Sequence, residues 1–75
     1  MQQEKWQELV SGFSEKQTVK GIVRNKNRDG VFVELKPGLF GMAEHKSGIL
    51  QGDRVRVLIK KISPEKMKIK LVILD

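Results

Sequence analysis

Three stretches of alternating apolar and polar residues constrain the fold of this chain more than any other feature. Residues 31–35 read Val-Phe-Val-Glu-Leu, which has the period of a strand with one buried face. The same alternation recurs in residues 54–60 and in residues 68–73. Turn-forming residues (Gly, Pro, Asn, Asp and Ser) separate these stretches. The pattern therefore predicts short strands joined by tight turns.

The number and length of these strands favour a closed structure. We predict five strands, near residues 18–26, 30–36, 39–43, 54–62 and 68–74. An open sheet of such short strands would leave long unpaired edges and one bare apolar face. A small five-stranded barrel avoids both. The 75 residues suffice for one such domain and no second one.

A helical period precedes the strands. Trp6, Leu9 and Phe13 are spaced as on one face of a helix, and mostly polar residues fill the positions between them. Because an isolated helix this short is marginal in water, we expect these three side chains to pack against the open end or the side of the barrel. We assign residues 1–16 to a helix and linker and residues 17–75 to the barrel domain.

The positive charge of the chain is concentrated in two segments. The net charge is +6, from 15 Lys and Arg against nine Asp and Glu. Residues 20–28 hold four cations and no acid, and residues 60–70 hold five cations against Glu65 alone. If the two segments lie side by side, they form a basic face that suits nucleic acid. The alternative is a solubility surface, because small domains often carry surplus lysines.

Composition argues against several kinds of chemistry. The absence of Cys and the presence of one His exclude disulfides, thiolate sites and multi-histidine metal sites. No nucleophile motif or phosphate-binding glycine loop occurs. We therefore expect no enzyme activity, no cofactor and no metal. The chain shows no signal-peptide pattern, and its longest apolar run is residues 71–74, so we expect a cytoplasmic protein with no membrane association.

Phe32 is the candidate binding residue that follows from alternation. If its neighbours on the strand point into the barrel, Phe32 must point outward. An outward phenylalanine is either covered by the helix or a loop, or it serves as a platform on which unpaired bases stack. We expect the hairpin to bring Lys20, Arg24 and Lys26 next to Phe32, with the last strand nearby. Cations around an aromatic ring favour the stacking role.

Two further residues, Phe40 and His45, are candidates for a binding surface. Phe40 follows a turn, and we interpret it as a core or partly buried residue that could also belong to a binding surface. His45 lies in the loop after the third strand, where a lone histidine is most often an ordinary surface residue. In a nucleic-acid site it could stack or donate a hydrogen bond.

The motifs of the chain, in their order and spacing, resemble the S1 RNA-binding domain over about residues 18–75. The matching runs are Val19-Lys20-Gly21-Ile22-Val23, Asp29-Gly30-Val31-Phe32-Val33-Glu34-Leu35, Gly41-Met42-Ala43-Glu44-His45-Lys46-Ser47, Gly52-Asp53-Arg54-Val55-Arg56-Val57, Lys60-Lys61-Ile62 and Lys68-Ile69-Lys70-Leu71. The resemblance implies an all-β, five-stranded antiparallel OB-fold barrel with a short helical turn near residues 45–49. It also implies that single-stranded RNA binds across the second and third strands.

The family's site residues carry over only in part. The exposed aromatic of its Gly-x-Phe-Val motif corresponds to Phe32, and the basic position opening the last strand corresponds to Lys68. Asp29 stands where the family often has a second aromatic, and Glu44 stands where it usually has a histidine, with His45 one place later. The resemblance thus implies RNA binding that is weaker, or more electrostatic, than that of a domain with the full motif.

The N-terminal pattern is similar to the linker helices that precede repeats in bacterial ribosomal protein S1, which implies one module of a longer protein. The leading hypothesis is a non-catalytic module of a ribosomal or translation-associated protein, monomeric in isolation, that binds single-stranded mRNA or rRNA and has the ribosome as a candidate partner. The residues expected to bind RNA are Phe32, Lys20, Arg24, Lys26, Arg28, His45, Lys60, Lys68 and Lys70. The alternative is a protein-interaction module in which Phe32, Phe40 and the Trp6 face form a docking patch.

Overall fold

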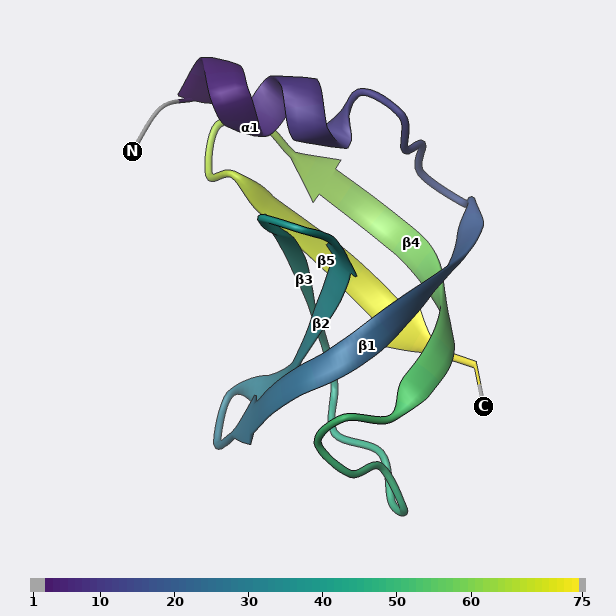
Figure 1. Ribbon diagram of the computed structural model, residues 1–75. Helices are drawn as coiled ribbons and strands as arrows, with labels where there is room; N and C mark the ends of the chain where they lie inside the picture. The colour runs from purple at the N-terminus through teal and green to yellow at the C-terminus, as the bar shows by residue number, and fades with distance from the viewer. Residues whose placement is uncertain (1–2, 75) are drawn as a thin grey trace.

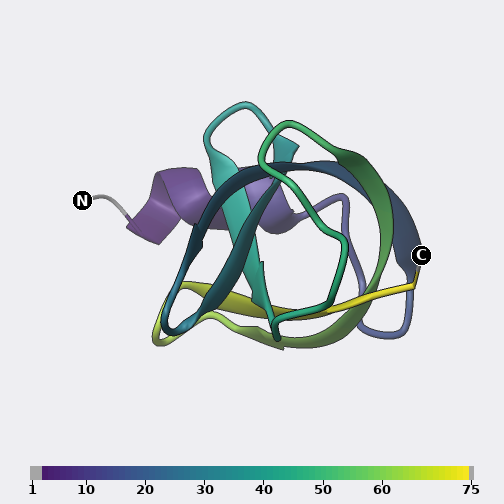
Figure 2. The same ribbon diagram turned by 90° about the horizontal axis from the view of Figure 1, so that it is seen from below.

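The computed structural model describes residues 3–74 as one helix followed by five strands (Figure 1). The elements are α1 (Gln3–Val10), β1 (Thr18–Asn27), β2 (Gly30–Lys36), β3 (Leu39–Ala43), β4 (Arg54–Ser63) and β5 (Lys68–Ile73). The strands close into a barrel in the order β1-β2-β3-β5-β4, and Figure 2 shows the ring of strands from below. The predicted five-stranded barrel is confirmed, and every strand boundary lies within one residue of the predicted one.

The barrel is mixed, so the expectation of purely antiparallel strands is wrong at one place. β3 and β5 run parallel, with Met42 opposite Lys70 and Ala43 opposite Leu71. The other neighbouring strands are antiparallel. Closure itself requires the exception, because strand direction cannot alternate all the way around a ring with an odd number of strands. The parallel pair sets the lysines of β5 beside the outward residues of β3.

Alternation along the strands decides which side chains fill the barrel. The most deeply buried side chains are Val23, Val31, Val33, Leu39, Val57, Ile59 and Ile69. On β5, for example, buried residues alternate regularly with exposed ones. The buried side chains that the structure describes are all apolar, so hydrophobic burial, and no internal polar network, stabilises this core. The outer surface is left to the residues between them.

Two glycines permit close contacts that the barrel needs. A Cβ on Gly41 would lie 2.5 Å from Cδ1 of Leu71, so only glycine lets β3 approach β5 this closely. Gly30, at the start of β2, has a φ of +152°, and a Cβ there would lie 2.5 Å from the carbonyl oxygen of Ala43. Both glycines therefore position β3 against its two neighbours.

The helix α1 packs across one end of the barrel (Figure 1). Trp6 is 4% exposed and Val10 is also buried, and both belong to the main core cluster. Leu9 and Phe13 are partly buried against the same cluster, and the Nζ of Lys36 lies 5.9 Å from the centre of the Phe13 ring. The predicted packing of the helix is thus confirmed. No helix within residues 3–74 is long and apolar enough to cross a membrane.

The segment between β3 and β4, residues 44–53, contains turns and no helix, so the expected helical turn near residues 45–49 is wrong. Hydrogen bonds to β1 hold this loop in place. The amide of Val23 donates to the carbonyl of Asp53 (2.8 Å), and the amide of Gly52 donates to the carbonyl of Val23 (2.7 Å). Ile49 is buried as an anchor. Together with the turn bond from the amide of Asp53 to the carbonyl of Leu50 (3.1 Å), these contacts give the segment turns where a helical turn was expected.

Candidate nucleic-acid interface

Phe32 and Met42 lie opposite each other on the outer surface of β2 and β3, and Lys70 of β5 lies opposite Met42. Each of the three is flanked along its strand by buried residues, so it faces away from the core. Phe32 and Met42 are half-buried, whereas Lys70 is exposed. The predicted outward orientation of Phe32 is confirmed.

Phe40 extends this apolar surface along β3. Its side chain is 44% exposed and its strand partner is Glu34, which puts it diagonal to Phe32. Phe40 is therefore outside the core, because Leu39 and Gly41 occupy the inward positions beside it. A core position was one part of our interpretation of it as a core or partly buried residue. We call the surface formed by Phe32, Phe40, Met42, Lys68 and Lys70 the aromatic face.

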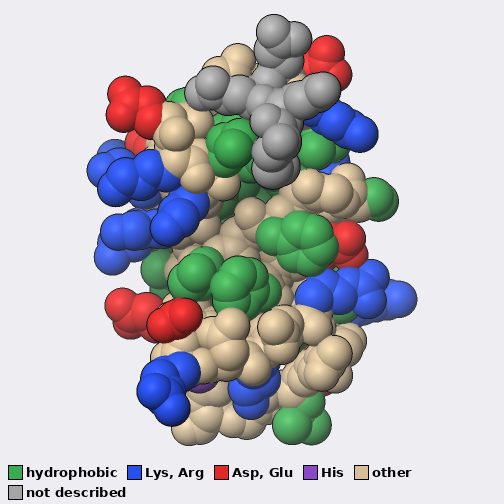
Figure 3. Space-filling view, turned by 90° about the vertical axis from the view of Figure 1, so that its left-hand side faces the viewer, with side chains coloured by type: hydrophobic (Ala, Val, Ile, Leu, Met, Phe, Trp, Pro, Cys, Tyr) green, Lys and Arg blue, Asp and Glu red, His purple; other side chains and the backbone are tan. Residues whose placement is uncertain are grey.

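Cations border this side of the molecule. Figure 3 views the side on which β2 and β3 lie, and it shows hydrophobic side chains near the centre with Lys and Arg groups to either side. Acidic groups are also present on this side, close to the hydrophobic ones. The surface combines apolar area with charge of both signs, and positive charge is in excess.

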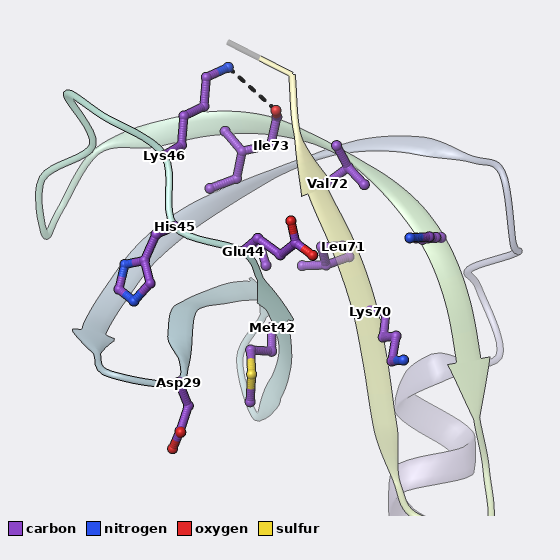
Figure 4. A pocket seen from close by; sticks show the side chains of 11 residues that line it. Asp29, Met42, Glu44, His45, Lys46, Lys70, Leu71, Val72 and Ile73 are labelled. Atoms are coloured by element: carbon purple, nitrogen blue, oxygen red, sulfur yellow. Dashed lines mark hydrogen bonds between the residues drawn. The ribbon is translucent and has the colours of Figure 1, made fainter.

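A groove of about 380 Å³ lies beside the aromatic face, between the end of β3 and β5 (Figure 4). Its walls include the cations Lys46, Lys60 and Lys70 and the acids Asp29 and Glu44. The net charge of this groove is therefore only slightly positive. Asp29, which the family resemblance marks as a missing aromatic, lies at its edge as an exposed carboxylate.

His45 and Glu44 point in different directions from the chain that follows β3. Figure 4 shows the Glu44 side chain directed toward β5 and the His45 ring directed away from it. Both residues are exposed. Lys46, the next residue, donates a hydrogen bond from Nζ to the carbonyl of Ile73 (3.4 Å). The histidine is therefore at the border of the groove, and a carboxylate occupies the side that faces β5.

Two lysines of β4, Lys60 and Lys61, lie next to the lysines of the aromatic face. Lys61 lies opposite Lys70, and Lys68 lies two residues before Lys70 on the same side of β5. A bulge at Lys60 adds one residue to β4, and this lets both Lys60 and Lys61 reach solvent. The structure thus brings the predicted Lys60, Lys68 and Lys70 together. Sequence reasoning missed Lys61, because strict alternation would turn it inward.

The cations of β1 do not surround Phe32 as expected. The β1 residue opposite Phe32 is Asn25. Lys26 donates a hydrogen bond from Nζ to the carbonyl of Ile49, so it fastens the loop between β3 and β4. Arg24 lies in a bulge of β1 and forms an ion pair with Glu34, with 2.8 Å between Nε and Oε1.

Lys20 lies near the start of β1, and Arg28 follows the end of this strand. Lys20 is opposite Arg56 of β4, on the side of β1 away from β2. Arg28 is exposed in the turn between β1 and β2, next to Asp29 at the edge of the groove. The eight residues predicted with Phe32 therefore fall on different parts of the surface.

A second and more basic groove, of about 800 Å³, crosses the outer surface of β4, β1 and the end of β2. Its charged lining residues are the cations Lys20, Arg24, Lys36, Arg54 and Arg56 and the acid Glu34. We call it the basic groove. Sequence reasoning did not select Lys36, Arg54 or Arg56 as site residues. The outward positions of Arg54 and Arg56 were readable from the alternation in β4, but their proximity to Lys20 depends on the pairing of β4 with β1.

No group of three or more His, Cys, Asp or Glu side chains within the described part of the chain could hold a metal ion. Neither groove therefore offers a metal centre made from those residues. What both grooves offer to a ligand is positive charge, and the first one also offers exposed aromatic surface nearby.

The comparisons with known proteins concern the fold. Neither the family models nor the sequences of curated proteins give a match. Among solved structures, the uncharacterized protein MJ1198 from Methanocaldococcus jannaschii is similar over 79% of this chain and 89% of its own, with 23% identity and a TM-score of 0.71. The chain has an OB-type barrel.

Two further solved structures share this barrel. GSP13 from Bacillus subtilis has 26% identity and a TM-score of 0.71, over 81% of this chain and 55% of its own. A chain in the a/eIF2alpha-aDim2p-rRNA complex from Pyrococcus horikoshii OT3 has 21% identity and a TM-score of 0.67, over 79% of this chain and 43% of its own. The chain thus spans about half the length of these two neighbours.

Proposed function

We propose that this chain is a non-catalytic, S1-type module that binds single-stranded RNA through its aromatic face, in a cytoplasmic ribosomal or translation-associated protein. The observation that carries the proposal is the row of Phe32, Met42 and Lys70 across three adjacent strands. An aromatic ring, a polarizable thioether and a cation in one row are suited to stacking a base and neutralising its phosphate.

Each part of the aromatic face has a role in this proposal. Phe32 stacks one base, and Phe40, at a diagonal position on β3, accepts a second one. Lys68 and Lys70 contact phosphates along β5. Lys60, at the edge of the groove, extends that line of charge. Stacking contributes about 1–3 kcal/mol per base with little discrimination among bases, so binding tolerates different RNA sequences.

The acids at the groove make binding weaker than that of a domain with a second aromatic and a histidine. Asp29 and Glu44 place carboxylates on the groove walls, where they repel phosphates. His45, at the border, can donate a hydrogen bond to RNA in place of the family's histidine. The fold supports the proposal, since a barrel of this kind also occurs in a complex that contains rRNA.

Docking of another protein on the same barrel is the competing function. This alternative requires the Trp6 face, Phe32 and Phe40 to form one exposed patch. Trp6, however, is 4% exposed and belongs to the core. Two exposed or half-exposed rings remain, and lysines lie on the neighbouring strand. This arrangement favours RNA over an apolar partner, because interface cores are depleted of charged residues, lysine among them.

Salt dependence of RNA affinity tests the proposal. Short poly-pyrimidine and poly-purine RNAs are titrated into the full chain and followed by NMR at several salt concentrations. We expect shifts centred on β2, β3 and β5, and a log–log slope of about −0.7 for each phosphate contact. Lys70→Gln should reduce the slope by about one contact, whereas Lys5→Gln, on the exposed side of α1, should not.

Two outcomes would count against the proposal. Affinity that does not change with salt would favour the apolar docking alternative. RNA cleavage by a highly purified sample, abolished by His45→Ala, would contradict the non-catalytic part.

A further inference from the structure

The lining of the basic groove carries more positive charge than the lining of the groove beside the aromatic face. The basic groove has five cations and one acid in its lining, whereas the groove beside the aromatic face has three cations, two acids and His45. Lys20 and Arg24 of β1 therefore share a groove with Arg54 and Arg56 of β4, whereas Lys26 is bonded to the loop between β3 and β4.

The strand register concentrates this charge. Lys20 lies directly opposite Arg56, and Arg54, two residues before Arg56 on β4, lies opposite Ile22. Lys20 and Arg54 are exposed, and Arg24 keeps 53% of its side chain exposed despite the ion pair with Glu34. A polyanion bound across the groove would be attracted by these cations.

The lining of the groove indicates which anion fits. Its uncharged lining residues are glycine, aliphatic residues and proline, and none is aromatic. The groove therefore offers contacts to phosphates but no ring on which an unpaired base can stack. Duplex RNA matches this chemistry, because its bases are stacked inside and it is recognised mostly through its shape, phosphates and 2′-hydroxyls. Single strands match the aromatic face instead.

The two surfaces are continuous across β2. Glu34 lines the basic groove and Phe32, two residues earlier, lies on the same outward side of the strand. Phe40, opposite Glu34, continues the aromatic face from the same point. A strand that leaves a duplex held in the basic groove can thus pass over β2 and reach the aromatic rings within a few nucleotides.

We propose that the basic groove binds the phosphate backbone of double-stranded RNA, so that the protein recognises the junction between a duplex and a single strand. The inference that duplex RNA binds here rests on the charge and lining of the groove. The inference that the protein recognises a junction rests also on the proposed function of the aromatic face.

Three RNAs separate binding by the basic groove from binding by the aromatic face. They are a single strand, a blunt duplex, and the same duplex with a single-stranded overhang. Fluorescence anisotropy measures their affinities for the wild-type chain and for a Lys20→Gln/Arg54→Gln double variant. The matched control is Lys5→Gln/Lys66→Gln, which removes the same charge from exposed positions outside both grooves. A melting curve for each variant confirms that it is folded.

The wild type should bind the overhang RNA more tightly than either simple RNA. The groove variant should lose affinity for the blunt duplex by about fivefold to tenfold for each lost contact near 0.1 M salt, with a slope smaller by about 0.9 per contact. Its affinity for the single strand should change by no more than that of the control.

The inference is overturned if the blunt duplex does not bind, or if the groove variant weakens single-strand and duplex binding equally. The second result would mean that the groove is part of one single-strand path. A failure of the proposed function gives a different result from a failure of this inference. In that case Phe32→Ala leaves single-strand affinity unchanged, while the groove variant still loses duplex affinity.

Discussion

Replacing Phe32 with alanine tests stacking separately from charge. The ring lies on the outer surface of β2 and is half-buried between its strand neighbours. Alanine removes the ring and leaves every lysine of the aromatic face in place. The expected result is a loss of RNA affinity without a change in the salt dependence of binding.

The expected losses of RNA affinity and of folding stability in Phe32→Ala can both be estimated. Loss of one stacked base reduces binding by about 1–3 kcal/mol, which raises the Kd about 5-fold to 150-fold. Truncating a fully buried phenylalanine costs about 3–5 kcal/mol of stability. Since the Phe32 ring is only half-buried, we expect a cost of roughly half that, about 2 kcal/mol. The variant should therefore fold at low temperature with a reduced Tm.

The assay combines binding and stability on the same samples. Anisotropy with a single-stranded RNA at three salt concentrations gives the Kd and the salt slope, and urea denaturation gives the free energy of unfolding. Leu50→Ala is the control, because Leu50 is 66% exposed in the loop between β3 and β4 and does not line either groove. It removes an exposed apolar side chain of similar size away from the proposed site.

Three results would refute the reasoning. An unchanged Kd in Phe32→Ala would exclude stacking on this ring. An equal rise of the Kd in Leu50→Ala would show a general effect of apolar truncation. A loss of about 3–5 kcal/mol in stability would place the ring in the core, and the site would then have to lie nearer Phe40 and His45.

Three further predictions concern packing and charge. Gly41→Ala should reduce the free energy of unfolding by about 1–3 kcal/mol, because its Cβ would lie 2.5 Å from Cδ1 of Leu71; Gly12→Ala, with no atom within 4 Å, should be neutral in the same urea titration. Trp6→Ala should cost about 3–5 kcal/mol, measured as a fall in Tm, whereas an unchanged Tm would show that α1 does not stabilise the barrel. Glu34→Gln should raise the affinity for duplex RNA severalfold by removing the acid of the basic groove, at a stability cost of less than about 1 kcal/mol, and lower affinity in a binding titration would contradict the role of that groove.

The sequence by itself determined which side each strand residue occupies. Alternation with period two is a property of the extended backbone, so the inward positions of Val31 and Val33 and the outward position of Phe32 followed from local order alone. The same rule, applied to β3, would have put Phe40 outside. The N-terminal helix was also readable, because the spacing of Trp6 and Leu9 is local.

Only the tertiary structure decided which outward residues share a surface. Closing an odd number of strands makes one pair parallel, and that pair sets Lys70 beside Met42. Pairing of β4 with β1 sets Arg56 against Lys20, and folding of a distant loop gives Lys26 its acceptor at Ile49. These contacts join residues far apart in the chain, and they depend on strand order and register, which local periodicity does not encode. Barrel closure therefore distributes the cations of one basic sequence between the aromatic face and the basic groove.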